Sequence, residues 1–463
     1  MADRAAGHDT LRWNYSLIFS SGISASTANQ LASAGLVLPF LYLALDAPVF
    51  FVALLLPFMT ASQLTAELLA APFMKESRRA KVSVIWPTLL TAAAFAVVAV
   101  SVEGVPEAAI VAIFIACAVV LGFCKGIKNV GYGQLFGMVV PSHRRGWFTF
   151  SQATIAGAVA IVIAWLTKDL LAADTPFQRH VIVLWVGIAA LVVAGVFIIG
   201  MRHIGEVIAS SGDAPPQEPV PGADDHNDGR RIGILRKVDG AHIGEELARG
   251  LRTGMSYVWF RRYMVARVLF LSVALAAPFY TIHAASFHKG TPHGLTALVI
   301  AASAGIAVGA PLWARVSKHS NRLVMIAGSF IAAASAALAL LLDFTGLVTD
   351  IWLYAGVVLI LSIGASGIAS CGYLYLIDMT SDSERPCLLA FTDVAVGIAA
   401  IIGSSVLGYV AHVNNPTVPL MVLLALNLVA GFFAMSLVDH ARAGDEPPDI
   451  AGREGGSPRR ASA

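Results

Sequence analysis

Charged residues are scarce in this chain of 463 residues. Asp, Glu, Lys and Arg together make up 13% of the sequence, whereas a soluble domain carries about 25%. Hydrophobic residues make up 57%, and they gather in long runs. Since about 20 apolar residues suffice to cross the hydrocarbon core of a bilayer, these runs exclude a soluble domain. They predict an all-α polytopic membrane protein.

Several motifs of chemical sites are also missing. The four cysteines include no CxxC pair, so we expect packing residues and no zinc or redox centre. There is no GxxxxGK[ST] phosphate loop, HExxH zinc motif or GxSxG nucleophile elbow. The sequence therefore predicts neither an enzyme nor a pump driven by ATP on this chain, and it predicts no cofactor and no metal. No basic patch with interleaved aromatic residues indicates a nucleic acid partner.

Apolar runs predict twelve membrane spans in two groups of six. The first group comprises residues 16–44, 48–74, 82–102, 108–138, 147–167 and 181–201. The second group comprises residues 263–287, 294–316, 323–342, 351–378, 387–411 and 417–437. We expect no cleaved signal peptide in the N-terminal segment 1–15, since it leads into a long span.

Polar segments separate and follow the two groups. Residues 203–262 are rich in Pro, Gly and Asp and are expected to form a linker, with an amphipathic surface helix near 241–259. The tail 439–463 is expected to be disordered. Positive charge gives the orientation: of the 31 Lys and Arg residues, only Lys168, Arg179 and Lys289 fall in outer loops when both termini are cytoplasmic.

The second group of spans repeats features of the first. At an offset of 240 residues, Arg145 aligns with Arg385 and Gly157 aligns with Gly397. Both arginines lie in a short inner loop before an apolar helix. The first of these loops reads PSHRRG and the second SERP. A further inner loop follows span 8 in GAPLWARVSKHSNR (309–322), although Lys318 stands near the place where an aspartate is expected.

With these motifs and its 6 + 6 plan, the chain resembles the major facilitator superfamily over residues 12–438. The resemblance implies two pseudo-symmetric bundles of six helices, residues 16–202 and 263–438, around a central cavity that opens alternately to each side. It also implies a monomer, and spans 1, 4 and 7 as cavity walls. Substrate sites in such repeated folds lie near the bilayer midplane. A bacterial inner membrane is the expected location.

Span 4 carries the clearest candidate site. Lys125, Lys128 and Tyr132 share one face, with Asn129 at its boundary, and a glycine stripe (Gly122, Gly126, Gly133, Gly137) lies alongside. Ionisable residues inside a span are costly and are functional candidates by default. The two lysines indicate a site for an anionic solute, or else they neutralise nearby carboxylates. A pair between Lys128 and Glu67 of span 2 is one such possibility.

The other intramembrane acids are candidates for proton coupling or for gates. Glu67 and Asp393 are deep enough to carry a proton or to pair structurally. Asp378 is shallower and is expected to pair with Arg315 or Arg385 at the inner surface, and Arg145 is the counterpart of Arg385 in the first half.

Spans 1 and 7 supply polar candidates for substrate binding. Asn29 and Gln30 are expected to face the cavity from span 1. Tyr280 and His283 lie one turn apart in span 7, where Pro278 is expected to kink the helix. His283 is either a substrate or proton ligand or an interfacial histidine.

Three functions remain open. The first is a secondary transporter of a small, anionic organic solute, with the proton-motive force as its candidate energy source. The second is a drug or amphiphile exporter working by proton antiport, which the carboxylates Glu67 and Asp393 would suit. The third is a non-transporting membrane sensor or assembly protein with the same fold. The partners expected are a small-molecule substrate and the lipid bilayer.

Overall fold

A computed structural model describes the chain in segments. The described residues are 2–45, 48–70, 77–100, 106–140, 145–170, 176–202, 252, 254–291, 293–380, 385–413 and 415–438. The helices among them account for the regular structure, and this part of the chain contains no β-strand. The linker with its amphipathic helix, the tail and the PSHR loop fall almost wholly outside these segments.

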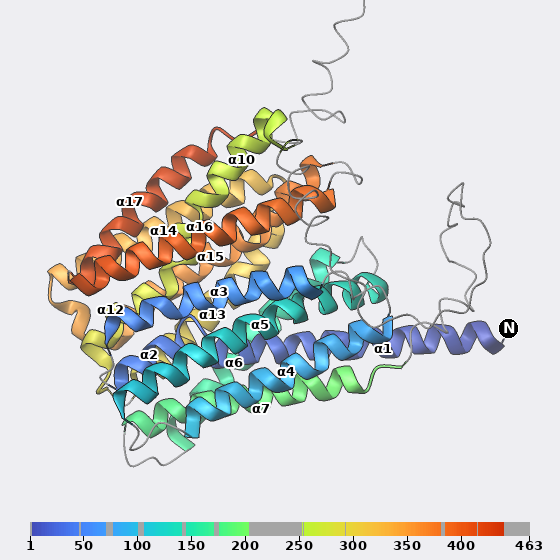
Figure 1. Ribbon diagram of the computed structural model, residues 1–463, viewed down its shortest axis with the longest axis horizontal. Coiled ribbons are helices and arrows are strands. Elements are labelled where there is room, and N and C mark those ends of the chain that lie inside the picture. The colour runs from blue at the N-terminus through green and yellow to red at the C-terminus, as the bar shows by residue number, and fades with distance from the viewer. Residues whose placement is uncertain are drawn as a thin grey trace, which may run out of the picture.

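The helices fall into an N-terminal and a C-terminal half (Figure 1). The first half contains α1 (Ala2–Leu31), α2 (Val37–Ala44), α3 (Val49–Ala70), α4 (Ser77–Val100), α5 (Glu107–Val139), α6 (Arg145–Leu170) and α7 (Pro176–Ile199). The second half contains α10 (Val258–Leu269), α11 (Leu271–Ala274), α12 (Ala276–His288), α13 (Gly294–Val316), α14 (Asn321–Phe344), η3 (Leu347–Thr349), α15 (Ile351–Met379), α16 (Arg385–Val413) and α17 (Thr417–Ala434).

Eleven stretches of the described helices are long and apolar enough to cross a membrane. One of them is the combined stretch Val258–His288, which joins α10, α11 and α12. The twelfth predicted span is α1 together with α2. α1 is too polar to be recognised by its hydropathy, and the apolar α2 has only eight residues. The chain is thus a multi-pass membrane protein, and the predicted plan of twelve spans in two bundles agrees with its fold.

Spans 1 and 7 are both interrupted near their middle. The helix of span 1 ends at Leu31 and resumes at Val37, with the amide of Val37 donating to Ser33 O at 2.7 Å. Span 7 breaks at Phe270 and Leu275, before the proline that was expected to bend it. Pro278 instead occupies the first turn of α12, where a proline removes no intrahelical hydrogen bond.

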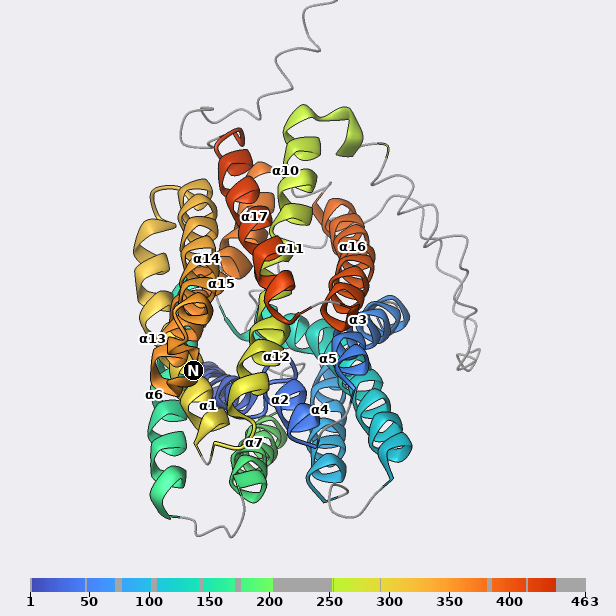
Figure 2. The same cartoon turned by 90° about the vertical axis from the view of Figure 1, so that its left-hand side faces the viewer.

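Glycines set the closest contacts between the two halves. α6 packs on α13 and α3 packs on α16, while α2 packs on α12 at the outer end (Figure 2). A Cβ on Gly157 of α6 would meet Ser303 O at 2.8 Å, and one on Gly397 of α16 would meet the side chain of Leu64. These are the two glycines that the repeat aligns, so the sequence repeat marks equivalent contacts in space.

A second pair of equivalent residues caps helices at the inner surface. Lys81 Nζ donates to Ile199 O at 2.8 Å and to Met201 O at 2.7 Å, at the end of α7. Arg322 donates to Ala434 O and Met435 O at the end of α17. Cations beside the last carbonyls of a helix satisfy acceptors that have no helical partner and favour its dipole.

The predicted glycine stripe of α5 contacts a neighbouring helix over half of its length. A Cβ on Gly122 would overlap Met59 O and the side chain of Ser62, and one on Gly126 would overlap Gln63 O, so both glycines let α5 approach α3. A Cβ on Gly133 would meet nothing within 4 Å.

This difference gives a matched pair of substitutions. We expect Gly122→Ala to lower the apparent melting temperature, because overpacking a tight contact costs about 1–3 kcal/mol. Gly133→Ala should leave it unchanged or raise it, since alanine favours a helix over glycine by up to about 1 kcal/mol. The measurement is thermal unfolding of the purified variants in detergent. Equal melting temperatures for the two variants would contradict the close contact of α5 with α3.

Candidate functional site

A polar cavity lies between the two halves, towards their inner ends. Its volume is about 320 Å³. Its walls come from α3, α5 and α16: Thr60, Gln63, Leu64, Glu67, Lys125, Asn129, Asp393, Val396, Gly397 and Ala400. We call it the charged cavity, because three of the ionisable residues that the sequence singled out meet in it.

Glu67 is the centre of the hydrogen bonding in the charged cavity. Its Oε1 accepts from Asn129 Nδ2 at 3.0 Å, across to α5, and from Gln63 Nε2 at 2.9 Å within α3. The charge of Glu67 also acts on Lys125. These contacts tie α3 to α5 through polar groups beside the glycine contact.

The charge of Glu67 acts on Lys125, whereas the sequence analysis suggested a pair between Glu67 and Lys128. Lys125 and Asn129 are four residues apart, so they share one face of α5, and both line the cavity. Lys128 lies on the neighbouring part of the helix surface and does not line the cavity. It is half-buried near Lys125 and Cys124. Tyr132, four residues after Lys128, lies beside Phe136 with ring centroids 6.0 Å apart.

The C-terminal half contributes Asp393, which is exposed on the cavity wall. Its charge interacts with those of Glu67 and of Arg267 on α10. Arg267 lies half-buried against Gly372 of α15. The sequence contained one indication that Asp393 and Arg267 could interact: each lies only one or two turns inside its span, on the inner side.

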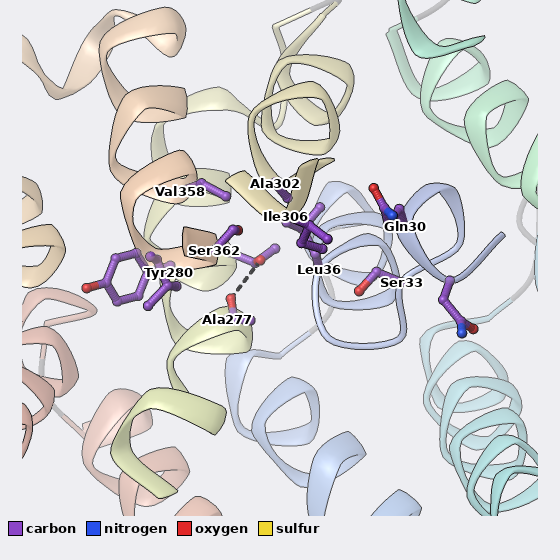
Figure 3. Close-up of a pocket in the computed structure, with 12 residues that line it drawn as sticks. Gln30, Ser33, Leu36, Ala277, Tyr280, Ala302, Ile306, Val358 and Ser362 are labelled. Atoms are coloured by element: carbon purple, nitrogen blue, oxygen red, sulfur yellow. Dashed lines mark hydrogen bonds between the residues drawn. The ribbon is translucent and has the colours of Figure 1, made fainter. Parts of the chain in front are cut away.

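A second cavity of about 160 Å³ lies where α1 breaks (Figure 3). It is lined by Asn29, Gln30, Ser33, Leu36, Ala277, Tyr280, Thr281, Ala302, Ile306, Val358, Leu361 and Ser362. Both amide atoms of Gln30 are buried and have no hydrogen-bond partner among the described residues. In Figure 3 the hydroxyl of Tyr280 points away from the residues of α1, so its aliphatic part and ring form the wall.

The remaining candidates lie away from both cavities. His283 is fully buried, with its Nδ1 3.1 Å from Tyr354 Oη and its Nε2 3.5 Å from Asp343 Oδ2. Asp378 accepts a hydrogen bond from Asn321 Nδ2 at 2.6 Å.

The arginines of the expected inner gates are exposed or only partly described. Arg315 is exposed, and its Nη1 lies 3.5 Å from Pro311 O in the preceding turn. Arg145 and Arg385 begin α6 and α16, and their side chains lie outside the description. No group of three or more His, Cys, Asp or Glu that could hold a metal ion occurs in the described segments.

Comparison with known proteins identifies the architecture. Residues 262–461 match the family model of the Major Facilitator Superfamily. Uncharacterized proteins of Mycobacterium tuberculosis and Mycobacterium bovis are 24% identical over 322 residues, which cover 69% of this chain. The match takes in 57% of the length of these relatives.

Solved transporter structures share the fold. The nucleoside transporter NupG superposes with a TM-score of 0.61 at 12% identity, over 92% of this chain and 98% of its own. The xylose transporter XylE from E. coli, in a partially occluded inward open conformation, gives a TM-score of 0.60 at 12% identity with the same coverage. The fucose:proton symporter FucP from E. coli gives 0.53 at 15% identity, over 92% and 98%.

The geometry of the charged cavity can be tested by a double-mutant cycle. We expect Glu67→Gln and Lys125→Met to be non-additive in apparent melting temperature, with a coupling of about 0.5–1 kcal/mol, since contacting charges couple and distant ones do not. Lys128→Met should combine additively with Glu67→Gln. Thermal unfolding of the four variants in each cycle measures both values. A larger coupling for Lys128 than for Lys125 would reverse the assignment.

Proposed function

We propose, from the premise that this chain is a multi-pass membrane protein of the major facilitator superfamily, that it is a secondary transporter. Its cargo would be a small organic anion, carried together with a proton by alternating access. The observation that carries the proposal is the meeting of Glu67, Lys125 and Asp393 in one cavity between the halves. By its mycobacterial relatives and its family, we place it as a monomer in a bacterial inner membrane.

Proton and anion would be coupled through Lys125. When Glu67 is ionised, it offsets the charge of Lys125 and its Oε1 accepts from Asn129. A proton on Glu67 removes that compensation and leaves Lys125 as a free cation on the cavity wall. An anionic solute can then pair with Lys125, so that the two ligands enter and leave together with no net charge transferred.

Alternating access follows from where the halves touch. The outer end is closed by α2 against α12, while the contacts of α3 with α16 and of α6 with α13 lie on either side of the cavities. A rocking motion about these glycine contacts would open the outer end. Asp393 would act as the charge partner of Arg267 in the half that moves.

A second candidate is an exporter of cationic amphiphiles. The charged cavity holds two carboxylates, Glu67 and Asp393, against the single lysine exposed in it, Lys125. If Lys125 remains paired with Glu67 throughout the cycle, Asp393 is the charge that a cargo meets, and a cation is favoured.

A ligand screen distinguishes these cargoes. Purified protein is warmed with small mono- and dicarboxylates, phosphorylated metabolites, neutral sugars, nucleosides and lipophilic cations. We expect an organic anion to raise the melting temperature by mass action, equivalent to about 2.7 kcal/mol at 100 times its Kd. The response should be lost in Lys125→Ala/Lys128→Ala and kept in Lys318→Ala, whose lysine is exposed at the end of α13.

Hits limited to lipophilic cations, or an unchanged response in the double variant, would favour the exporter. With an anionic hit, proteoliposomes test the coupling. Uptake by the wild-type protein should be driven by an inward proton gradient. Glu67→Gln should exchange solute across the membrane and lose accumulation against a gradient. Accumulation that persists in Glu67→Gln would remove Glu67 from the coupling mechanism.

A further inference from the structure

A buried polar cluster lies at the outer end of the C-terminal half, away from the charged cavity. It joins His283 of α12, Asp343 of α14, Tyr354 of α15 and Thr417 of α17. His283 is 1% exposed, whereas the side chain of Asp343 is 23% exposed near the end of its helix. The cluster therefore has one buried member and one that reaches the outer surface.

The hydrogen bonds of the cluster fix where its protons lie. Tyr354 Oη donates to Tyr280 O at 3.0 Å, because a carbonyl can only accept. That uses the single hydroxyl proton, so the contact of 3.1 Å between Tyr354 Oη and His283 Nδ1 requires Nδ1 to be the donor. A neutral imidazole protonated on Nδ1 has a bare lone pair on Nε2.

That lone pair would face a carboxylate. The nearest charged group to His283 Nε2 is Asp343 Oδ2 at 3.5 Å, and Thr417 Oγ1 donates to the same oxygen at 2.8 Å. A bare nitrogen opposite an ionised carboxylate is repulsive, and a buried net charge is costly. The arrangement is satisfied when one further proton is present, as an imidazolium beside a carboxylate or as a carboxylic acid beside the imidazole.

We infer that His283 and Asp343 together form a proton-binding site reached from the outer face, and that its proton holds α12 in the position that closes the outer end. Binding consumes only a proton from outer water, and release returns it. The inference does not rest on the charged cavity or on the identity of the solute.

The position of α12 makes the site relevant to closure. α12 is the C-terminal partner of α2 in the outer contact. Ala277 in its first turn approaches Gly35, and a Cβ on Gly294, just after α12, would lie 3.2 Å from Phe40 Cζ. Loss of the proton would leave the carboxylate of Asp343 opposite the bare lone pair of His283 Nε2, between α14 and α12. A shift of α12 away from α14 would relieve this repulsion and would loosen the contact with α2.

Several other titratable groups lie near α12. His180 of α7 and His293 lie near Lys289 at the end of the helix, and Glu67 is on α3, which also contacts α12. His288 on α12 itself acts on His283, and its Nε2 is 2.8 Å from Val348 O; Asp350, beyond η3, acts on His288. Lys289 follows the helix. α2, η3 and α17 carry no Asp, Glu, Lys, Arg or His, and α15 offers only Tyr354 in its first turns towards this site. His288 and Asp350 are therefore the controls that a pH response needs.

The experiment measures whether the outer end opens when the proton is lost. Ala277→Cys places a thiol in the second cavity, behind the outer contact. Leu347→Cys places one on the exposed outer loop as a reference for the intrinsic pH dependence of thiol reactivity. A membrane-impermeant maleimide is added to intact cells at about pH 6 and about pH 9, and the parent chain gives the background.

We expect the labelling rate of Ala277→Cys, relative to Leu347→Cys, to rise at least about threefold at the higher pH. Asp343→Asn supplies an amide donor to His283 Nε2 without titrating, so its ratio should stay low at both pH values. Asp350→Asn and His288→Gln, each combined with Ala277→Cys, should show the same rise in labelling with pH as Ala277→Cys alone.

If the labelling rate of Ala277→Cys relative to Leu347→Cys does not change with pH, the inference is overturned. This result does not depend on whether Asp343→Asn folds. A pH response that persists in Asp343→Asn, or that disappears in Asp350→Asn or His288→Gln, would also overturn it.

Discussion

The close approach of α3 to two other helices is the constraint on which the functional region depends. On one side α3 lies against α5, where Gly122 and Gly126 leave room for its backbone. On the other side it meets α16, where Gly397 accommodates Leu64. Because apolar burial gives little preference for helix contact within lipid, such contacts rely on small residues that let backbones pack. They bring a glutamate, a lysine and an aspartate from three separate helices to one cavity.

Three of the intramembrane acids interact electrostatically with a cation or a titratable base of another helix. Glu67 of α3 acts on Lys125 of α5, Asp393 of α16 acts on Arg267 of α10, and Asp343 of α14 lies beside His283 of α12. Leaving any one of these acids unpaired in a low-dielectric interior would be expensive. The pairs therefore stabilise the packing of their helices, and the same sensitivity makes a proton or a solute able to shift it.

Much of this organisation could be read from the sequence. Hydropathy and charge distribution predicted the spans and their plan, and an offset of 240 residues paired Gly157 with Gly397, which occupy equivalent contacts in the structure. Glu67, Lys125, Asn129 and Asp393 were each candidates before their positions were known.

The partners of these residues could not be predicted in the same way. Which lysine lines the cavity beside Glu67 depends on the rotation of α5 about its axis, and residues three apart on a helix differ in direction by only about 60°. The neighbours of His283 and Arg267 come from helices distant in sequence. Helix order and rotation are set by packing, which a single sequence records only as scattered small residues.

The polarity of α1 has a consequence for how the protein is made. Alone among the described helices that form the twelve spans, α1 with α2 is not recognised by its hydropathy, because α1 is polar and α2 has only eight residues. The principal packing partners of α1 are α6 and α7. Residues such as Gln30 and Asn29 partition poorly into lipid by themselves. We therefore expect α1 to settle in the bilayer only after α7 has been synthesised, so that for these helices translation order and assembly order differ.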